Sequence, residues 1–213
     1  MLTYENGKLA LWVSDPFATI FKKITLPGQE RTLVSKDRCW NIYSFCKHCS
    51  VIGGDFVECG VYKGGTAYII ANAISDDTVL HLFDTFDGMP ELANNDPAPE
   101  KSGDYKSNFD DVVSFLSGFN NICFYRGVMP ETFKTVNVPK VSFLHVDVDL
   151  YASTRDVFGF FYDKMVIGGV ILCDDYGFPG YADAAKRAVD EFFIDKKETP
   201  IYLPTGQCLI IKL

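Results

Sequence analysis

The chain has 213 residues and a formal net charge of −8, with 28 acidic against 20 basic side chains. A chain of this length can bury a full core, so we expect one domain over residues 1–213. The acidic surplus disfavours nucleic acid and anionic membranes as partners. No apolar run approaches the roughly 20 residues of a membrane span, and the N-terminus lacks the pattern of a signal peptide.

Seven cysteines are scattered along the chain, and several of them lie within apolar runs. An odd number in this pattern is typical of reduced, buried thiols and predicts a cytoplasmic protein. Cys46 and Cys49 have the spacing of a redox pair or of half a zinc site. Since no second Cys-x-x-Cys completes a zinc site, we favour the interpretation that both thiols lie on one face of a helix.

The first 35 residues carry no strong pattern, and we expect them to form an N-terminal arm or lid. Apolar residues then recur at helical spacing over residues 35–50, with Ser35 as a plausible cap. Five short apolar strands follow, at residues 55–59, 79–84, 121–127, 141–147 and 169–175. Helices are expected at residues 67–74, 104–116, 130–136, 153–165 and 179–196. The last residues, 200–213, predict a hairpin around a Pro-Thr-Gly-Gln turn.

This order of elements indicates the fold class. Short apolar strands that alternate with helices predict an α/β protein with a mostly parallel sheet and helices on both faces. The closing hairpin adds one antiparallel strand. A polar, proline-containing loop over residues 85–102 is long for a compact domain, and such loops are usually functional or mobile. Ligands of these sheets bind beyond the carboxyl ends of the strands, near the point where the strand order reverses.

The turn after the first of these strands is suited to hold a cofactor. It reads ECGVYKGGT from Glu58 to Thr66. Gly60 and Gly64 let the backbone approach a ligand closely, and the helix that follows offers free N–H groups. The spacing differs from G-x-G-x-x-G, which disfavours a nicotinamide oxidoreductase. Glu58 suits an ammonium group, and Asp84 ends the second strand, where an acid accepts ribose hydroxyls unless it only caps the loop. Together these features predict S-adenosylmethionine as the cofactor.

Four acids lie at the ends of the fourth and fifth predicted strands, Asp147 and Asp149 at one and Asp174 and Asp175 at the other. If these strands are neighbours, the four carboxylates gather at one edge of the sheet. Such a cluster must bind a cation, share protons or be spread into solvent. The alternative for these acids is helix capping and loop solvation. His145 lies back within the apolar run, so we expect a buried, hydrogen-bonded histidine.

Four segments resemble a known family, the macrocin O-methyltransferases. They read FVECGVYKGGTA, HLFDTFDGMPE, FLHVDVDLYASTRD and GGVILCDDYGFPGYADAAKRAVDEFF. The D-x-D-L-Y-x-S-T and D-D-Y-x-x-P-G patterns are the most specific parts, and the resemblance runs from about residue 30 to the C-terminus. Members of that family methylate sugar hydroxyls of natural products with S-adenosylmethionine and a divalent metal, usually Mg²⁺. The resemblance implies the class I S-adenosylmethionine methyltransferase fold, with six parallel strands and one antiparallel strand.

The resemblance also implies roles for individual residues. The E-x-G-x-x-x-G turn would hold the methionine end of the cofactor, and Asp84 would hold its ribose. After the third strand the family often has Gly-Trp-Phe near the adenine, whereas this chain has Gly-Val-Met, so only Gly127 is carried over. The implied cofactor contacts are Glu58, Gly60, Gly64, Thr66, Asp84 and Gly127. The implied metal ligands are Asp147, Asp174 and Asp175, and the implied base is Asp149.

These acids suit the methylation of a hydroxyl. A sugar hydroxyl is hardly ionised at neutral pH, so a cation that stabilises the alkoxide and a base that accepts the proton both help. We therefore predict a metal-dependent O-methyltransferase for a sugar-bearing small molecule, compatible with a homodimer. The alternative is an enzyme for catechol-like diols, but those resemble Asp-Asn at the position of Asp174-Asp175 and use a lysine. Four intact acids disfavour a non-catalytic binding module.

Overall fold

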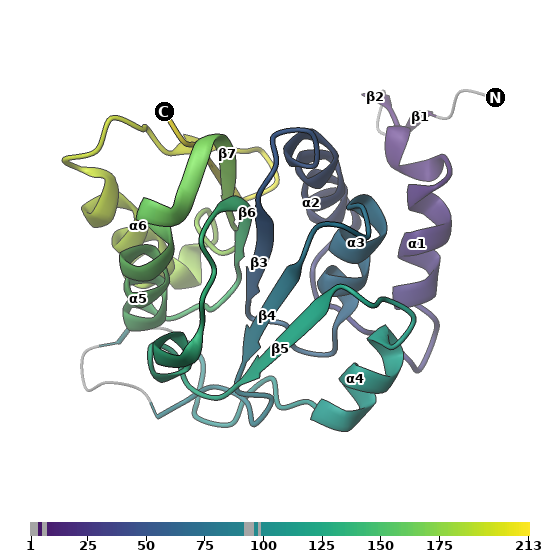
Figure 1. Ribbon diagram of the computed structural model, residues 1–213, viewed down its shortest axis with the longest axis horizontal. Helices are drawn as coiled ribbons and strands as arrows, with labels where there is room; N and C mark the ends of the chain where they lie inside the picture. The colour runs from purple at the N-terminus through teal and green to yellow at the C-terminus, as the bar shows by residue number, and fades with distance from the viewer. Residues whose placement is uncertain (1–3, 6–7, 92–95, 98) are drawn as a thin grey trace.

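The computed structural model describes residues 4–5, 8–91, 96–97 and 99–213. A seven-stranded sheet lies at the centre, with helices on both sides (Figure 1). The spatial order of its strands is β5-β4-β3-β6-β7-β9-β8. The strands are β3 (Asp55–Cys59), β4 (Leu80–Asp84), β5 (Ile122–Arg126), β6 (Val141–Val146), β7 (Met165–Cys173), β8 (Ile201–Tyr202) and β9 (Cys208–Ile211).

The strand directions confirm the predicted fold class. The pairs β5·β4, β4·β3, β3·β6 and β6·β7 are parallel, and β9 is antiparallel to both β7 and β8. Six strands therefore point one way and one points the other way. The chain runs outward from β3 to β5 on one side and from β6 to the hairpin on the other. The order reverses between β3 and β6, which is where a ligand site is expected.

Helices cover both faces of the sheet (Figure 1). The longer helices are α1 (Phe17–Ile24), α2 (Lys36–Cys49), α3 (Gly65–Ala73), α4 (Phe109–Leu116), α5 (Tyr151–Phe161) and α6 (Ala185–Phe193). The short elements are β1 (Tyr4–Glu5), β2 (Lys8–Leu9), η1 (Leu11–Val13), η2 (Glu131–Thr135), η3 (Tyr162–Lys164) and η4 (Pro179–Tyr181). Helices α2 and α3 lie on one face with α1 packed outside them, and α5 and α6 pack together on the other face.

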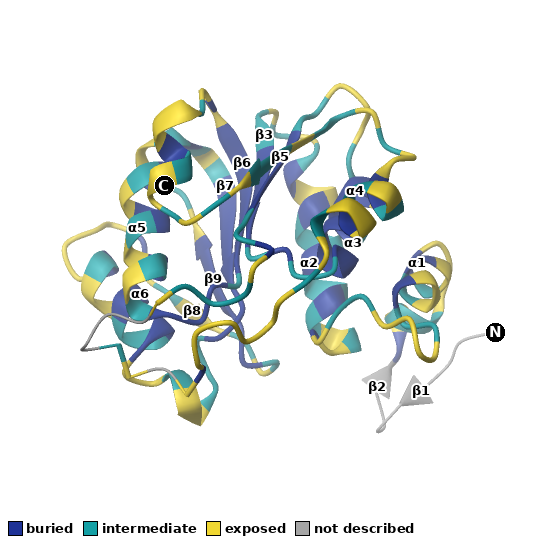
Figure 2. Cartoon of the chain, turned by 90° about the horizontal axis from the view of Figure 1, so that it is seen from below, coloured by how far each residue is buried: buried dark blue, intermediate teal, exposed yellow. Residues whose placement is uncertain are grey.

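Alternate residues of each strand enter two different cores. On β3, Phe56 packs with the residues of α2 and α3, whereas Val57 packs with those of α5 and α6. Phe143 and Leu144 of β6 divide in the same way. Figure 2 shows the buried sheet between helices whose outer sides are exposed. Since both faces of the parallel strands are covered, their sequences are continuous apolar runs rather than alternating ones.

Three helices differ from the sequence-based expectation. One starts later, one starts earlier and one is divided into two parts. Helix α4 begins after Asn108, whose side chain accepts a hydrogen bond from an amide of the first turn, and not at residue 104. Helix α5 begins at Tyr151, and its first amides donate to the carboxylate of Asp96 at 3.2–3.3 Å. A carboxylate from the long loop therefore replaces Ser153 as the cap. The helix predicted at the D-D-Y-x-x-P-G segment is divided into η4 and α6.

The N-terminal segment contains a packed helix. Phe17, Ile20 and Ile24 of α1 are buried against α2 and α3. The arm or lid expected over residues 1–35 stays a prediction for the segment as a whole, and part of it lies outside the described residues. Five residues of the predicted 85–102 loop, 92–95 and 98, also lie outside the described residues. None of the helices in the described ranges is long and apolar enough to cross a membrane.

The cysteines behave as the sequence predicted. Cys46 and Cys49 are both buried on α2, which confirms the helix-face interpretation of the Cys-x-x-Cys spacing. All seven thiols are free, and Cys123 is the exposed one. Burial raises the pKa of Cys46, Cys59 and Cys173 well above the ordinary value for a thiol. These side chains are therefore neutral parts of the core.

Candidate active site

A cavity of about 320 Å³ opens at the carboxyl ends of β3, β4, β6 and β7, where the strand order reverses. Its floor is formed by the turns that follow these strands. One wall is the segment before α2, residues 31–35, of which residues 31–34 line the cavity, and further lining comes from the long loop and η4. The predicted site residues that line the cavity are Gly60, Thr66, Asp84, Asp147, Asp149, Asp174 and Asp175. The fold thus brings residues from four strand ends to one place.

Gly60 allows the turn after β3 to touch the end of β6. Its φ is +90°, and a Cβ at this position would lie 1.8 Å from the carbonyl oxygen of Asp147. Only glycine fits such a contact. The amide of Asp147 also donates to the carbonyl of Cys59 at 2.9 Å. The turn and the first acid of D-x-D are therefore held together by backbone contacts alone.

Glu58 is fully buried one residue before this turn, next to His145 on the neighbouring strand. Its Oε1 lies 2.9 Å from Nδ1 of His145, whereas Oε2 is buried without a hydrogen-bond partner among the described residues. Burial alone lowers the pKa of His145, but the neighbouring carboxylates of Asp174, 3.8 Å from Nε2, and of Glu58 raise it to about 10. His145 is thus buried and hydrogen-bonded, as predicted. The free oxygen of Glu58 fits the ammonium group of an amino-acid ligand.

Other predicted cofactor residues have different surroundings. Thr66 lies in the first turn of α3 and is buried at the edge of the cavity. Gly64 precedes this helix with φ +81° and packs against Val112 and Leu116 of α4, away from the cavity. Gly127 is also outside the cavity lining, although the two residues after it line the cavity. The roles of these residues in cofactor binding stay predictions.

Asp84 lines the cavity and also fastens two loops. Its Oδ2 accepts the amides of Val61 and Tyr62 at 2.7 and 2.9 Å, and its Oδ1 accepts the amide of Phe86 at 2.6 Å. A carboxylate has about four acceptor positions, so about one remains for a ligand hydroxyl. Both interpretations of the sequence, loop cap and ribose acceptor, therefore stay compatible with the geometry.

Three of the four clustered acids converge. One oxygen from each of Asp147, Asp149 and Asp175 lies within 4.8 Å of the others. Burial raises the pKa of Asp147 and Asp175 well above the usual range, and neighbouring carboxylates raise both further. Burial and the nearby charge of Glu100 raise the pKa of Asp149 to about 7. Closely spaced hard oxygen donors that repel one another are a donor set that fits a divalent cation such as Mg²⁺.

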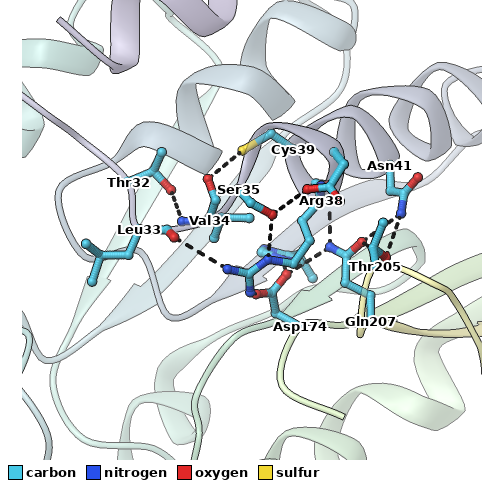
Figure 3. A network of polar contacts seen from close by, with 12 residues as sticks. Thr32, Leu33, Val34, Ser35, Arg38, Cys39, Asn41, Asp174, Thr205 and Gln207 are labelled. Carbon is cyan, nitrogen blue, oxygen red and sulfur yellow. Dashed lines mark hydrogen bonds and ion pairs between the residues drawn. The ribbon is translucent and has the colours of Figure 1, made fainter. Parts of the chain in front are cut away.

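Asp174 has different partners (Figure 3). Its Oδ2 forms an ion pair with Nη1 of Arg38, and its Oδ1 accepts the amide of Gln207 at 2.8 Å. Burial alone would raise the pKa of Asp174, but the nearby imidazole of His145 and the charge of Arg38 lower it overall. Asp174 is not among the three converging acids, so its predicted role as a metal ligand has to be considered separately from theirs.

Two further groups near Asp149 were not expected as site residues. The hydroxyl of Tyr181 in η4 donates to Oε1 of Glu100 in the long loop, and Tyr105 donates to the same oxygen at 3.4 Å. The second oxygen of Glu100 is buried without a partner among the described residues. No local sequence pattern marks Glu100 or Arg38, because their partners lie about 80 and 136 residues away.

The comparisons with known proteins agree with this geometry. A family model described as "Macrocin-O-methyltransferase (TylF)" matches residues 22–202. The fold and the site define an S-adenosylmethionine-dependent O-methyltransferase. The chain belongs to the macrocin O-methyltransferase family, as the resemblance predicted.

Two relatives illustrate the similarity. Demethyldecarbamoylnovobiocin O-methyltransferase of Streptomyces niveus is 30% identical over 186 residues, which cover 78% of this chain and 69% of that protein. Mycinamicin III 3''-O-methyltransferase of Micromonospora griseorubida is 27% identical over 199 residues, covering 78% and 71%.

Solved structures share the fold. The O-methyltransferase NovP superposes with a TM-score of 0.72 at 23% identity, over 86% of this chain and 82% of that one. The calicheamicin methyltransferase CalS11 gives 0.68 at 13% identity, over 99% and 95%.

Proposed function

We propose that this protein transfers a methyl group to a hydroxyl of a sugar or glycosylated natural product, with the help of a divalent cation. The observation that carries the proposal is the convergence of Asp147, Asp149 and Asp175 beside the turn that begins at the buried Glu58. The two relatives named above are named for methylation of antibiotics or their precursors. A cytoplasmic location and a homodimer stay predictions, the former supported by seven free thiols.

The donor side of the cavity would hold S-adenosylmethionine, which supplies the methyl group. Glu58 would bind its ammonium through the free Oε2, and Asp84 would accept a ribose hydroxyl at its remaining acceptor position. The turn at Gly60 and the start of α3 at Thr66 would line the methionine end. Since Glu58 is held by His145, its carboxylate keeps one orientation before the donor arrives.

The acid side would orient and deprotonate the acceptor. Asp149 would accept the hydroxyl proton, because burial and the nearby charge of Glu100 raise its pKa and make this carboxylate a stronger base than an exposed one. Asp147 and Asp175, with Asp174 as the predicted third ligand, would hold Mg²⁺. The cation would supply Lewis-acid stabilisation of the developing alkoxide. Tyr181, bonded to Glu100, lies beside Asp149 in the cavity lining and would exclude water from it.

Calorimetry and an acceptor panel test this proposal. We expect S-adenosylhomocysteine to bind, and methyl transfer to glycosylated natural products to require Mg²⁺ and stop in chelator. Catechol-like diols are the comparison substrates. Activity on sugars that survives chelator would refute the metal dependence, and transfer to catechols alone would refute the acceptor class. Absence of S-adenosylhomocysteine binding would refute the donor site.

A further inference from the structure

Arg38 reaches the acids from the first turn of α2, and its side chain points toward Asp174 (Figure 3). Its Nη1 pairs with Oδ2 of Asp174. The two side chains are 15% and 1% exposed, so this is a largely buried ion pair. Among the described residues, Arg38 and His145 are the cationic side chains in contact with Asp174.

The same guanidinium also binds the wall of the cavity. Its Nη2 donates to the carbonyl of Leu33 at 3.4 Å, and its Nε donates to Oγ of Ser35 at 3.2 Å. The guanidinium carbon Cζ of Arg38 lies 5.0 Å from the centre of the Phe178 ring. Phe178 follows the Asp174-Asp175 pair in the chain and lines the cavity. One side chain therefore connects an acid, an aromatic wall residue and the segment before α2.

This segment, residues 31–35, forms one wall of the cavity. Four of its residues line the cavity, and its other end is fastened to the start of α3, where the amide of Gly65 donates to the carbonyl of Arg31 at 3.1 Å. A Cβ on Gly65 would lie 2.7 Å from that carbonyl oxygen. The wall is thus held at one end by the donor-binding helix and at the other by Arg38.

Asp174 is fixed from its other side by the hairpin. The Gln207 amide donates to Oδ1 of Asp174 at 2.8 Å and to the carbonyl of Arg38 at 3.4 Å. Asn41 of α2 in turn donates to Gln207 at 2.8 Å. Nη1 of Arg38 contacts one carboxylate oxygen of Asp174 and the Gln207 amide contacts the other, so these two groups hold the carboxylate in one orientation. Carboxyl groups outnumber the cationic side chains around it, so a bound dication would not remove the electrostatic reason for Arg38 to stay.

We propose that Arg38 is a positioning residue that fixes the wall, residues 31–35, and Asp174 in one arrangement, so that the donor site and the acid cluster both depend on it. The cation arm of this inference rests on the proposed function, whereas the donor arm does not. Partners of this kind behind metal-binding carboxylates typically contribute about 10- to 100-fold to metal affinity.

Binding measurements on two variants test the inference without any assay of turnover. Mn²⁺ binding is followed by electron paramagnetic resonance and S-adenosylhomocysteine binding by calorimetry. For Arg38→Gln we expect Mn²⁺ affinity to fall about 10- to 100-fold and S-adenosylhomocysteine affinity to fall about tenfold. Arg38→Lys keeps a positive charge but has one nitrogen in place of the guanidinium fork. We therefore expect near-native Mn²⁺ affinity, whereas S-adenosylhomocysteine affinity should fall as it does in Arg38→Gln.

The matched control is Arg126→Gln, which removes an arginine paired with Asp87 at 3.1 Å outside the cavity and should change neither affinity. Thermal unfolding identifies variants that fail to fold, and Arg38→Lys then carries the test. Unchanged donor affinity in the Arg38 variants, or tighter Mn²⁺ binding in Arg38→Gln, would overturn the inference, as would full recovery of both affinities by lysine. If the native chain binds the donor product but no Mn²⁺, the metal dependence fails and donor affinity alone decides the role of Arg38.

Discussion

Four residues around the cavity hold a backbone conformation that side chains normally avoid. Tyr62, Phe86, Tyr105 and Asp149 have φ between 51° and 61°. Each such residue costs on the order of 1–3 kcal/mol and persists only where its surroundings fix it. Asp149 has this conformation at the point where the chain leaves β6 and turns into α5. The backbone at this position turns the second acid of D-x-D toward the first and toward Asp175.

The first prediction concerns Asp149. Asparagine has nearly the same shape and tolerates a positive φ, so Asp149→Asn should fold normally. We expect unchanged S-adenosylhomocysteine affinity and a turnover lower by about 10²–10⁴-fold, because the amide cannot accept the hydroxyl proton. Steady-state kinetics and calorimetry provide the two numbers. The control is Asp183→Asn, which replaces an exposed acid and should leave turnover unchanged. Full turnover in Asp149→Asn with bound acceptor would reject the base.

The second prediction concerns the free oxygen of Glu58. Glu58→Gln removes the negative charge proposed to meet the donor ammonium, so S-adenosylhomocysteine affinity should fall about tenfold or more. Glu198→Gln is the control, since Glu198 is also a buried carboxylate but bonds to Tyr162 and Lys212, outside the cavity. It should alter stability and leave donor affinity as in the native chain. Equal donor affinity in the two variants would remove Glu58 from the donor site.

At the scale of elements, the end of the hairpin is fastened by one buried carboxylate. Glu198 accepts hydrogen bonds from Tyr162 and Lys212, both at 2.8 Å, and from the amide of Leu213 at 3.2 Å. Burial acts to raise its pKa, but these donors outweigh burial and lower the pKa to about 2. The contacts join β9 to the turn after α5. They therefore hold β9, the antiparallel strand that directly follows Gln207, the residue bonded to Asp174.

The third prediction follows from this network. A carboxylate whose pKa is lowered in the folded state stabilises the fold above its unfolded pKa, near 4.5, and loses that contribution as the pH falls toward 2. Glu198→Gln should lower the free energy of unfolding by about 1–3 kcal/mol at pH 7. The difference from the native chain should shrink as the pH falls below 4.5, measured by urea unfolding. Glu131→Gln, at an exposed ion pair, should have no measurable effect. A difference that is constant with pH would contradict the assignment.

At the scale of the whole molecule, the cavity is made of pieces that are far apart in the sequence. The strands, their order of appearance and the acids at their ends were predictable, because apolar runs and terminal acids are local patterns. The partners of Asp174 were not predictable, because Arg38 and Gln207 meet it only in the folded chain. The start of α5 was missed for the same reason, since its cap comes from Asp96 in the preceding long loop.

The fourth prediction concerns how much a bound donor product stabilises the folded chain whose separate segments form the cavity. A ligand at about 100 times its Kd stabilises the folded state by about 2.7 kcal/mol. For a chain of this size, that corresponds to a rise in Tm of about 5–11 °C. We expect S-adenosylhomocysteine to give a shift of this size by differential scanning calorimetry, and adenosine without the amino-acid part to give a smaller one. Equal shifts would mean that the methionine end contributes nothing.

The contact between Gly60 and the carbonyl of Asp147 has a consequence for engineering this enzyme toward new acceptors. No side chain fits between the turn after β3 and the end of β6, so libraries that vary this position will mainly return unfolded chains. Leu33, in contrast, lines the cavity and is 64% exposed, so its replacement disturbs little of the core. Diversity introduced at Leu33 and at Val128 reshapes the entrance while leaving the four strand ends intact. The molecule thus separates a part that tolerates redesign from a part that does not.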